Sequence, residues 1–265
     1  MTGSLKRMMV ELAETVRENE RVRREIEIAT EIQKSIFPEH PPEVAGLEIE
    51  AKSVPAKEVG GDYYDFMPVS SGNQMGFIIA DASGKGLPGT LYMTRSRSVF
   101  RVVSSEEVSP GKILSRSNSY IAADASSGKG MFITVLYLLY DELKKRMTCA
   151  NAGHYPPLWY RAKEKVFFET TTSGVPVGIL SEQAYQEETI QLDQHDLLVM
   201  YTDGVTEAKA KDGSMFGIER LKRLVEQNSA LNAHDLFVKI QAGIKEFIDE
   251  APPFDDLTLI VIRVK

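Results

Sequence analysis

Hydrophobic and polar positions divide the chain into an N-terminal segment with a helical repeat and a longer segment of alternating strand and helix patterns. Residues 1–38 are dense in Glu and Arg, and their first proline is Pro38. A heptad repeat fits this segment. The seam positions that we expect to pair with a second chain are Leu5, Met8, Leu12, Asn19, Val22 and Ile26. The pattern predicts one long coiled-coil helix that stops at proline and forms a homodimer.

The polar residue in this seam, Asn19, occupies a central a position, where Asn favours two parallel strands. A helix of this kind is suited to carry the state of an upstream sensor domain or regulator to the rest of the chain. A single amphipathic helix lying on its own domain is the alternative.

From Gly46 onward, apolar runs typical of strands alternate in blocks with helical spacing. The expected strands are Leu47–Ala51, Met75–Ala80, Met131–Tyr140, Leu197–Thr202 and Leu257–Val264. The expected helices are Thr90–Val103, Pro110–Ala123, Phe216–Glu226 and Ala233–Ile248. Because these elements come in runs, the pattern favours an α+β fold of antiparallel sheets covered by helices. We expect two domains, a helical linker over residues 1–38 and a globular domain over residues 39–265.

Composition narrows the class of protein. The chain has 265 residues, 43% of them hydrophobic, and a net charge of -7, which disfavours a nucleic-acid partner. The single cysteine, Cys149, excludes an intrachain disulfide and is expected to be a buried thiol in a strand. No apolar run approaches the roughly 18 residues that span a bilayer. We expect a cytoplasmic protein, either complete or the cytosolic part of a larger membrane-bound sensor.

Four short acidic stretches carry the candidate chemistry. Their aspartates, Asp62, Asp81, Asp203 and Asp255, lie beside glycine or at a strand end, and we expect each of them to end or follow an apolar strand. Carboxylates without nearby His or Cys are ligands for hard cations such as Mg²⁺ and Mn²⁺. A single Asp beside Gly is more often an ordinary turn residue, but four in matching contexts favour a metal site.

The order of these stretches resembles a known family. The motifs are Val59–Asp65 (VGGDYYD), Ala80–Gly86 (ADASGKG), Asn151–Pro157 (NAGHYPP), Thr202–Ala208 (TDGVTEA) and Asp255–Thr258 (DDLT). In this order they are similar to PPM-type (protein phosphatase 2C-like) metal-dependent phosphatases, in particular the SpoIIE-like branch that includes sigma-factor regulators. The resemblance covers about residues 31–265 and implies an α-β-β-α sandwich with two Mn²⁺ or Mg²⁺ ions at one end of the paired sheets.

The resemblance also implies roles for individual residues. Asp62, Asp81, Asp203 and Asp255 are the expected catalytic metal ligands, and the carbonyl of Ala82 is an additional one. Asp256 is assigned to a supporting position, because adjacent residues of a strand face opposite ways. Lys57 stands where the wider family places a phosphate-binding Arg, although a solvated surface lysine is as good an interpretation. The segment Gly84, Lys85 and Gly86 is expected to belong to a regulatory switch.

The implied reaction is hydrolysis of phosphoserine or phosphothreonine in a protein by water that two cations activate. Ser83 stands where the wider family has a His that is assigned as the acid, so the proton donor is open. His154 is interpreted as a structural turn residue. The substrate implied is a phosphorylated anti-sigma-factor antagonist of the STAS type.

Three other interpretations compete with this one. Gly60-Gly61-Asp62 resembles a loop of diguanylate cyclases, but Tyr63 occupies the position of a required acidic residue. A catalytically weak interaction module acting through its coiled coil is disfavoured, because all four metal-ligand candidates are retained. A small-molecule phosphohydrolase has the same ligands and stays open.

Overall fold

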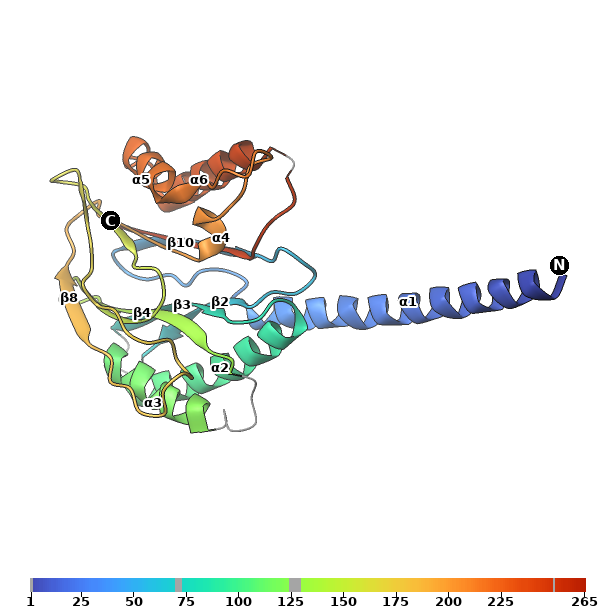
Figure 1. Ribbon diagram of the computed structural model, residues 1–265. Coiled ribbons are helices and arrows are strands. Elements are labelled where there is room, and N and C mark those ends of the chain that lie inside the picture. The colour runs from blue at the N-terminus through green and yellow to red at the C-terminus, as the bar shows by residue number, and fades with distance from the viewer. Residues whose placement is uncertain (1, 70–72, 124–129, 250) are drawn as a thin grey trace. The chain divides into compact units, whose positions relative to one another are not determined.

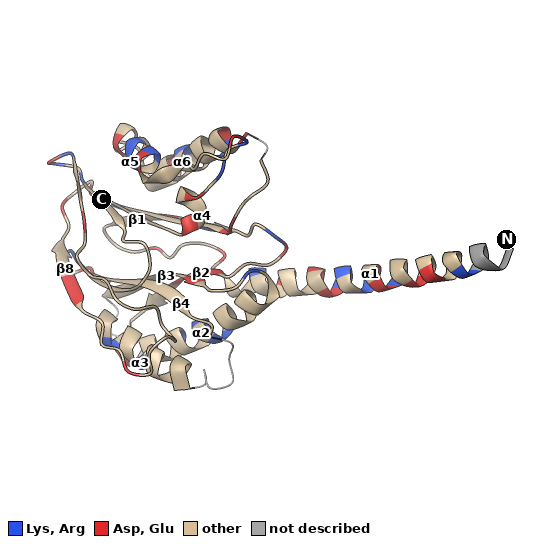
Figure 2. Cartoon of the chain, in the orientation of Figure 1, with Lys and Arg blue, Asp and Glu red and all other residues tan. Residues whose placement is uncertain are grey.

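The N-terminal unit is one long helix. The computed structural model describes residues 2–69, 73–123, 130–249 and 251–265, with side chains from residue 7 onward. The chain forms two compact units, Met1–Ile36 and Phe37–Lys265. Helix α1 runs over Thr2–Ile36, which confirms the predicted helix, and it carries both charges along its length (Figure 2). The side chain of Leu5 lies outside the described residues.

On α1, the described seam side chains are exposed. The exposed fractions of the apolar members fall between 37% for Ile26 and 63% for Leu12, and Asn19 is exposed too. Elsewhere on the helix, ion pairs at i and i+4 join Arg7 to Glu11 and Arg23 to Glu27. Such pairs add only a few tenths of a kcal/mol each, about 0.2–0.5, so most of the stability of a long polar helix must come from packing against something else.

The second unit contains two five-stranded sheets, and every strand pair in them is antiparallel. The first sheet has the order β1 (Leu47–Val54), β10 (Leu257–Val264), β9 (Leu197–Tyr201), β6 (Leu158–Arg161), β7 (Val166–Phe168). The second has the order β2 (Asp62–Pro68), β3 (Gln74–Ala82), β4 (Ile133–Asp141), β5 (Arg146–Ala152), β8 (Glu187–Gln191).

Helices cover the outer face of each sheet (Figure 1). Helices α2 (Leu87–Glu106) and α3 (Pro110–Ala123) pack on the sheet of β2–β5. Helices α5 (Gly217–Gln227) and α6 (Ala233–Ile248) pack on the sheet of β1 and β10, and the short helix α4 (Asp203–Thr206) follows β9. The predicted α-β-β-α sandwich is therefore confirmed.

Side chains of a strand point alternately to its two faces, which explains why the central strands are apolar at consecutive positions. In β3, Phe77 and Ile79 enter the core between the two sheets, whereas Ile78 and Ala80 enter the core under α2 and α3. Both faces of the central strands are buried, so both must be apolar, and alternation with polar residues disappears. The same rule tells which face of the sandwich each aspartate occupies.

Several elements differ from expectation. The strands β2, β6, β7 and β8 were not predicted, and the last three have only four, three and five residues. Runs this short give little periodicity to recognise. Helix α2 begins three residues before Thr90 and ends three after Val103.

Cys149 is buried in β5, and burial raises the pKa of its thiol to about 11, as an inert structural thiol requires. Within the described ranges, no helix is long and apolar enough to cross a membrane.

Candidate metal centre

Asp62 and Asp81 are direct neighbours at one end of the sandwich. Asp62 begins β2 and is paired with Asp81, near the end of β3. Tyr64, two residues after Asp62, and Ile79, two residues before Asp81, lie in the core between the sheets. Because side chains alternate along a strand, Asp62 and Asp81 face the same space as those core residues, where the space opens to solvent. The two carboxylates therefore line the gap between the sheets.

The aspartates are distributed over strand starts and strand ends. Asp81 lies near the end of β3 and Asp203 follows β9, as expected. The expectation that Asp62 and Asp255 would also end or follow a strand was wrong, since they precede or begin β2 and β10. In antiparallel sheets the start of one strand lies beside the end of its neighbour, so residues of both kinds meet at one edge.

Asp62 is held by hydroxyl groups from the opposite sheet. One of its carboxylate oxygens, Oδ2, accepts hydrogen bonds from Thr202 Oγ1 at 2.7 Å and Thr258 Oγ1 at 2.6 Å. Thr202 follows β9 and Thr258 lies in β10. The side chain of Asp62 is buried, with a residue exposure of 3%. These two bonds tie the sheets together at the site and fix the orientation of the carboxylate.

Asp256 binds the backbone of the segment that leads into β2. Its carboxylate accepts hydrogen bonds from the N–H groups of Ala56 at 2.8 Å and Gly61 at 2.7 Å. A side chain at Gly60 would collide with this carboxylate, which explains the glycine there. The carboxylate of Asp256 thus braces the loop that leads to Asp62, and Asp256 also lines a cavity together with Asp81 and Asp255.

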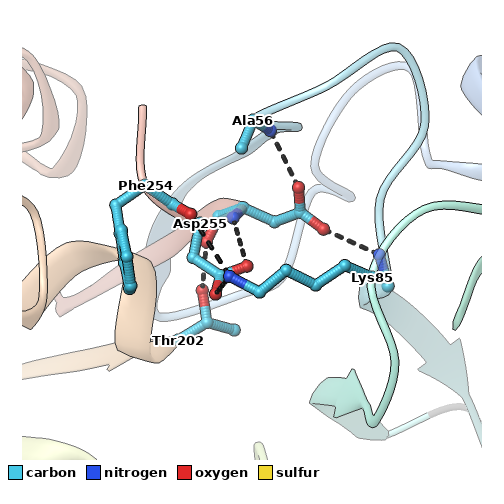
Figure 3. A network of polar contacts seen from close by, with 7 residues as sticks. Ala56, Lys85, Thr202, Phe254 and Asp255 are labelled. Carbon is cyan, nitrogen blue, oxygen red and sulfur yellow. Dashed lines mark hydrogen bonds and ion pairs between the residues drawn. The ribbon is translucent and has the colours of Figure 1, made fainter. Parts of the chain in front are cut away.

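Asp255 faces a lysine from the turn before α2. Lys85 Nζ lies 2.7 Å from Asp255 Oδ2 and 3.4 Å from the carbonyl oxygen of Phe254 (Figure 3). The side chains of Lys85 and Asp255 are 58% and 28% exposed. Exposed ion pairs contribute little free energy, about 0–1 kcal/mol, so a cation that binds Asp255 more strongly can replace this one.

The electrostatics of the cluster disfavour bare carboxylates. Burial, followed by the charge of Asp81, raises the pKa of Asp62 well above its usual value. Burial, followed by the charges of Asp203, Asp255 and Asp256, raises the pKa of Asp81 to about 7. Burial and then the charge of Asp255 raise the pKa of Asp203. Positive charge nearby would stabilise the ionised form of each of these carboxylates, and a bound divalent cation supplies such charge.

The donor set fits a hard cation, although the carboxylates point to other partners. In the part of the chain that the structure describes, no three Asp, Glu, His or Cys side chains are placed to hold one metal ion. Asp62 is turned to the threonine hydroxyls and Asp255 to Lys85. A set of clustered carboxylates and backbone carbonyls is the chemistry that Mg²⁺ and Mn²⁺ prefer. For Asp255 to hold a cation, its carboxylate would have to exchange Lys85 for that cation.

A cavity of about 290 Å³ opens beside Asp81, Asp255 and Asp256, and its lining does not include Asp62 or Asp203. Asp81, Asp255 and Ala82 line it together with Lys57, whose side chain is exposed. The turn Gly84-Lys85-Gly86 forms another part of the wall. Gly84 and Gly86 have φ values of 97° and 73°, in the left-handed region that favours glycine. The structure therefore brings the predicted phosphate-binding lysine and the predicted switch segment to the same cavity.

The first turn of α2 is tied to the metal-site loop. Thr90 Oγ1 donates a hydrogen bond to the carbonyl oxygen of Gly60 at 2.9 Å, two residues before Asp62. Pro88 lies in the first turn, where its missing N–H costs no helical hydrogen bond. A movement of α2 would therefore act directly on the loop that precedes Asp62.

His154 is a structural residue. Its Nδ1 lies 2.8 Å from Thr134 Oγ1 and its Nε2 lies 3.2 Å from the carbonyl oxygen of Tyr201. Nε2 donates to that carbonyl, so Nδ1 accepts from the threonine. Burial lowers the pKa of the imidazole to about 4. Asn151 completes the motif by bonding both the N–H and the carbonyl of His154, as in a turn. A neutral ring with both nitrogens engaged has no proton to give near neutral pH.

Sequence reasoning missed the two hydroxyl groups that donate hydrogen bonds to Asp62. Thr202 and Thr258 stand inside two of the recognised motifs, but each reads as a β-branched strand residue. The signal available in the sequence was the alternation of side chains along each strand. Thr258 lies two residues before the core residue Ile260, and Thr202 lies two residues after the core residue Met200. Both hydroxyls are thereby placed on the face between the sheets, opposite Asp62.

The fold and this arrangement of aspartates define a class, the PP2C-like phosphatases. The SiaA-PP2C domain of Pseudomonas aeruginosa superposes with a TM-score of 0.81 at 18% identity, over 93% of this chain and 98% of that one. RsbX, whose crystal structure contains magnesium, superposes with a TM-score of 0.64 at 14% identity, over 84% of this chain and 98% of that one. These likenesses establish the fold.

Sequence comparison gives the family. The model of the stage II sporulation protein E (SpoIIE) family matches residues 71–265. The phosphoserine phosphatase RsbU of Bacillus subtilis (strain 168) is 31% identical over 246 residues, which cover 92% of this chain and 71% of RsbU. The chain belongs to the SpoIIE family. The predicted family, fold and enzyme class, a protein serine/threonine phosphatase, are thereby confirmed.

Proposed function

We propose that the chain is a Mn²⁺- or Mg²⁺-dependent phosphatase that hydrolyses phosphoserine or phosphothreonine in a protein, with two cations in its site. The observation that carries this is the set of clustered aspartates, three of which have pKa values raised by burial and by neighbouring carboxylates. Asp62, Asp81, Asp203 and Asp255 are the proposed ligands, with the carbonyl of Ala82 as a further one. The magnesium in RsbX supports the choice of a hard cation.

When bound, two such ions lower the pKa of a water molecule and neutralise phosphoryl oxygens. The chain's own residues position these groups. Thr202 and Thr258 orient Asp62 through its Oδ2, and Asp256 holds the loop behind it. Lys57 lines the same cavity and is proposed to pair with a phosphate oxygen as a point charge.

Two groups are unsuited to protonate the leaving oxygen. His154 is buried and neutral, with both ring nitrogens engaged. The hydroxyl of Ser83 accepts a hydrogen bond from the N–H of Phe132 at 2.9 Å, and a serine hydroxyl is a weak acid in any case. The leaving alkoxide would therefore take its proton from water or from another acid of the site.

The proposed substrate is a phosphorylated anti-sigma-factor antagonist of the STAS type, in the cytoplasm. The similarity to RsbU, a phosphoserine phosphatase, supports a phosphoserine protein as the substrate class. A small-molecule phosphohydrolase with the same ligands is the second candidate. An interaction module acting through its coiled coil alone is disfavoured by the retained aspartate cluster.

Phosphate release tests this function directly. The purified chain is expected to release phosphate from a phosphoserine protein when Mn²⁺ is present and to stop when a chelator removes it, since the carboxylates alone cannot activate water. Inorganic phosphate is measured with and without Mn²⁺, on the protein and on p-nitrophenyl phosphate. Faster turnover of the small ester, with none of the protein, would favour the second candidate.

For residues 1–38 we propose a linker that dimerises through the exposed seam of α1 and leads into a phosphatase domain over residues 39–265. The seam consists of Leu5, Met8, Leu12, Asn19, Val22 and Ile26, and its apolar members with described side chains are all exposed. An upstream sensor or regulator would act through the pairing of these helices on the segment Gly84–Gly86. That segment is suited to the task, because it contacts Asp255 and leads into α2.

Deletion of residues 1–30 is expected to convert a dimer into a monomer, because it removes the whole seam. Sedimentation equilibrium measures the mass of both forms, and phosphate release reports whether the domain stays active. An unchanged mass together with unchanged turnover would exclude a role for the helix in pairing and regulation.

A further inference from the structure

A second, apolar cavity lies next to the candidate metal centre. It has a volume of about 280 Å³ and lies between the C-terminal half of α6, the end of β1 and the residues before β10. Most of its lining is aliphatic or aromatic. The apolar side chains that matter most are Val54, Ile244, Ile248, Pro252, Phe254 and Leu257. The metal-site cavity contains more charged residues, namely Lys57, Asp81, Lys85, Asp255 and Asp256, so the two cavities differ in the chemistry that they accept.

The two cavities share a wall. Pro253, Phe254 and Asp255 line both of them, so the apolar cavity begins on the other side of the segment that carries a proposed metal ligand. The ring of Phe254 is held on this partition by two ammonium groups. Lys209 Nζ lies 3.3 Å from the ring centroid and Lys85 Nζ lies 4.6 Å from it. Such cation–π contacts fix the partition without closing either cavity.

We propose that this cavity binds an apolar side chain of the phosphoprotein substrate, a few residues from the phosphorylated one. The inference rests on the proposed function, since the phosphorylated residue must lie at the neighbouring carboxylates. An extended polypeptide advances about 3.3–3.6 Å per residue, so a few residues suffice to pass from one cavity to the other across the segment Pro253–Asp255 that lines both. The cavity is a specificity site that the metal chemistry itself does not require.

Size and charge favour this occupant. Pockets for drug-sized ligands begin at about 300 Å³, so a cavity of this volume suits one large side chain such as Leu, Met or Phe. Lys209 and Lys245 also line it. Their ammonium groups complement the phosphate or carboxylates of the same substrate segment and disfavour a basic one. Burial of one such side chain is expected to raise kcat/KM about tenfold.

A phosphoserine peptide series tests the inference. A single leucine is moved one position at a time through the residues before and after the phosphoserine, in a background of small polar residues, and a leucine-free peptide and p-nitrophenyl phosphate serve as references. With Mn²⁺, the wild-type chain is expected to hydrolyse the peptide with leucine at one particular position with a kcat/KM about tenfold higher than that of the leucine-free peptide.

Val54→Asp is the decisive variant, because Val54 lines the cavity and is 40% exposed. It is expected to remove the preference for leucine and to leave turnover of p-nitrophenyl phosphate unchanged. Val54→Phe fills the same space without a charge, and Phe is suited to a strand. It should therefore also remove the preference for leucine, even if Val54→Asp disturbs folding. The matched control is Val238→Asp, on α6 at 46% exposure and outside the cavity lining.

The outcomes separate this inference from the proposed function. Absence of any leucine preference in the wild type, or a preference that both Val54 variants retain, overturns the inference. A cavity that serves a second copy of the chain would reveal itself as a change of mass in Val54→Asp with peptide rates unaltered, which also overturns it. Failure to hydrolyse every peptide and p-nitrophenyl phosphate in Mn²⁺ is instead a failure of the proposed function.

Discussion

Asp81→Asn is expected to lower Mn²⁺-dependent turnover of a phosphoserine peptide by about 1,000-fold, since metal ions supply several kcal/mol of transition-state stabilisation. Asp81 lies between the two sheets beside Asp62 and feels the charges of Asp203 and Asp255. Asp81 is therefore the proposed ligand at which we expect loss of the charge to have the largest effect. The amide keeps the shape of the side chain but removes the charge that draws the cations in. Phosphate release over a range of Mn²⁺ concentrations measures the loss.

The variant should stay folded. In the metal-free protein Asp81 suffers from burial and from the neighbouring carboxylates, so Asn is expected to leave the free energy of unfolding unchanged or to increase it. Urea unfolding in the presence of chelator checks this. Asp212→Asn, at an exposed turn, is the matched control and should keep full turnover. Wild-type turnover in Asp81→Asn would refute the ligand assignment, and loss of folding would leave Asp203→Asn as the equivalent test.

Long elements with one dominant period could be predicted from the sequence. The helices Pro110–Ala123 and Ala233–Ile248 and the strand Leu257–Val264 have the expected bounds in the structure. The strand β2 was missed because Tyr63 and Met67 enter one core and Tyr64 and Phe66 the other, so that apolar and polar positions do not alternate, and the buried Asp65 interrupts the apolar run. A pattern of burial cannot be recognised when every position is buried.

The site could be predicted in part. The motifs gave the aspartates, and the alternation of side chains along each strand gives the face of each sheet on which Asp62 and Asp81 lie. The pattern within one strand does not reveal which residues of the two sheets lie opposite one another. The stacking of the sheets brings Thr202 and Thr258 from one sheet to Asp62 of the other. That pairing depends on how the two sheets stack, a property of the whole core.

The candidate metal centre is thus a junction between two sheets and one helix. Asp62 and Asp81 come from the sheet under α2, whereas Asp203 and Asp255 flank strands of the other sheet. Lys85, just before α2, reaches across to Asp255 (Figure 3). A small shift of α2 changes both the Lys85 contact and the Thr90 bond to Gly60. Regulation through α2 would need no long pathway, because Lys85 just before the helix and Thr90 in its first turn contact the two halves of the site.

Asp256→Ala is expected to lower the free energy of unfolding by about 2–3 kcal/mol, because it leaves the N–H groups of Ala56 and Gly61 without an acceptor. Both groups belong to the loop that carries Asp62 into place. Loss of a brace behind a metal ligand costs about 10–100-fold in metal affinity or activity. We therefore expect a weaker dependence on Mn²⁺, with higher Mn²⁺ needed for half-maximal turnover. Urea unfolding and Mn²⁺ titrations of phosphate release measure the two effects.

Asp256→Asn separates a brace from a metal ligand. The amide oxygen still accepts one of the two backbone hydrogen bonds, so a brace predicts stability and turnover between those of Asp256→Ala and the wild type. A metal ligand predicts instead that Asn is as damaging as Ala, because both remove the charge. Equal loss of Mn²⁺ dependence in the two variants, with stability near that of the wild type, would move Asp256 into the metal centre. Such a result would require the carboxylate to leave Ala56 and Gly61 when the ions bind.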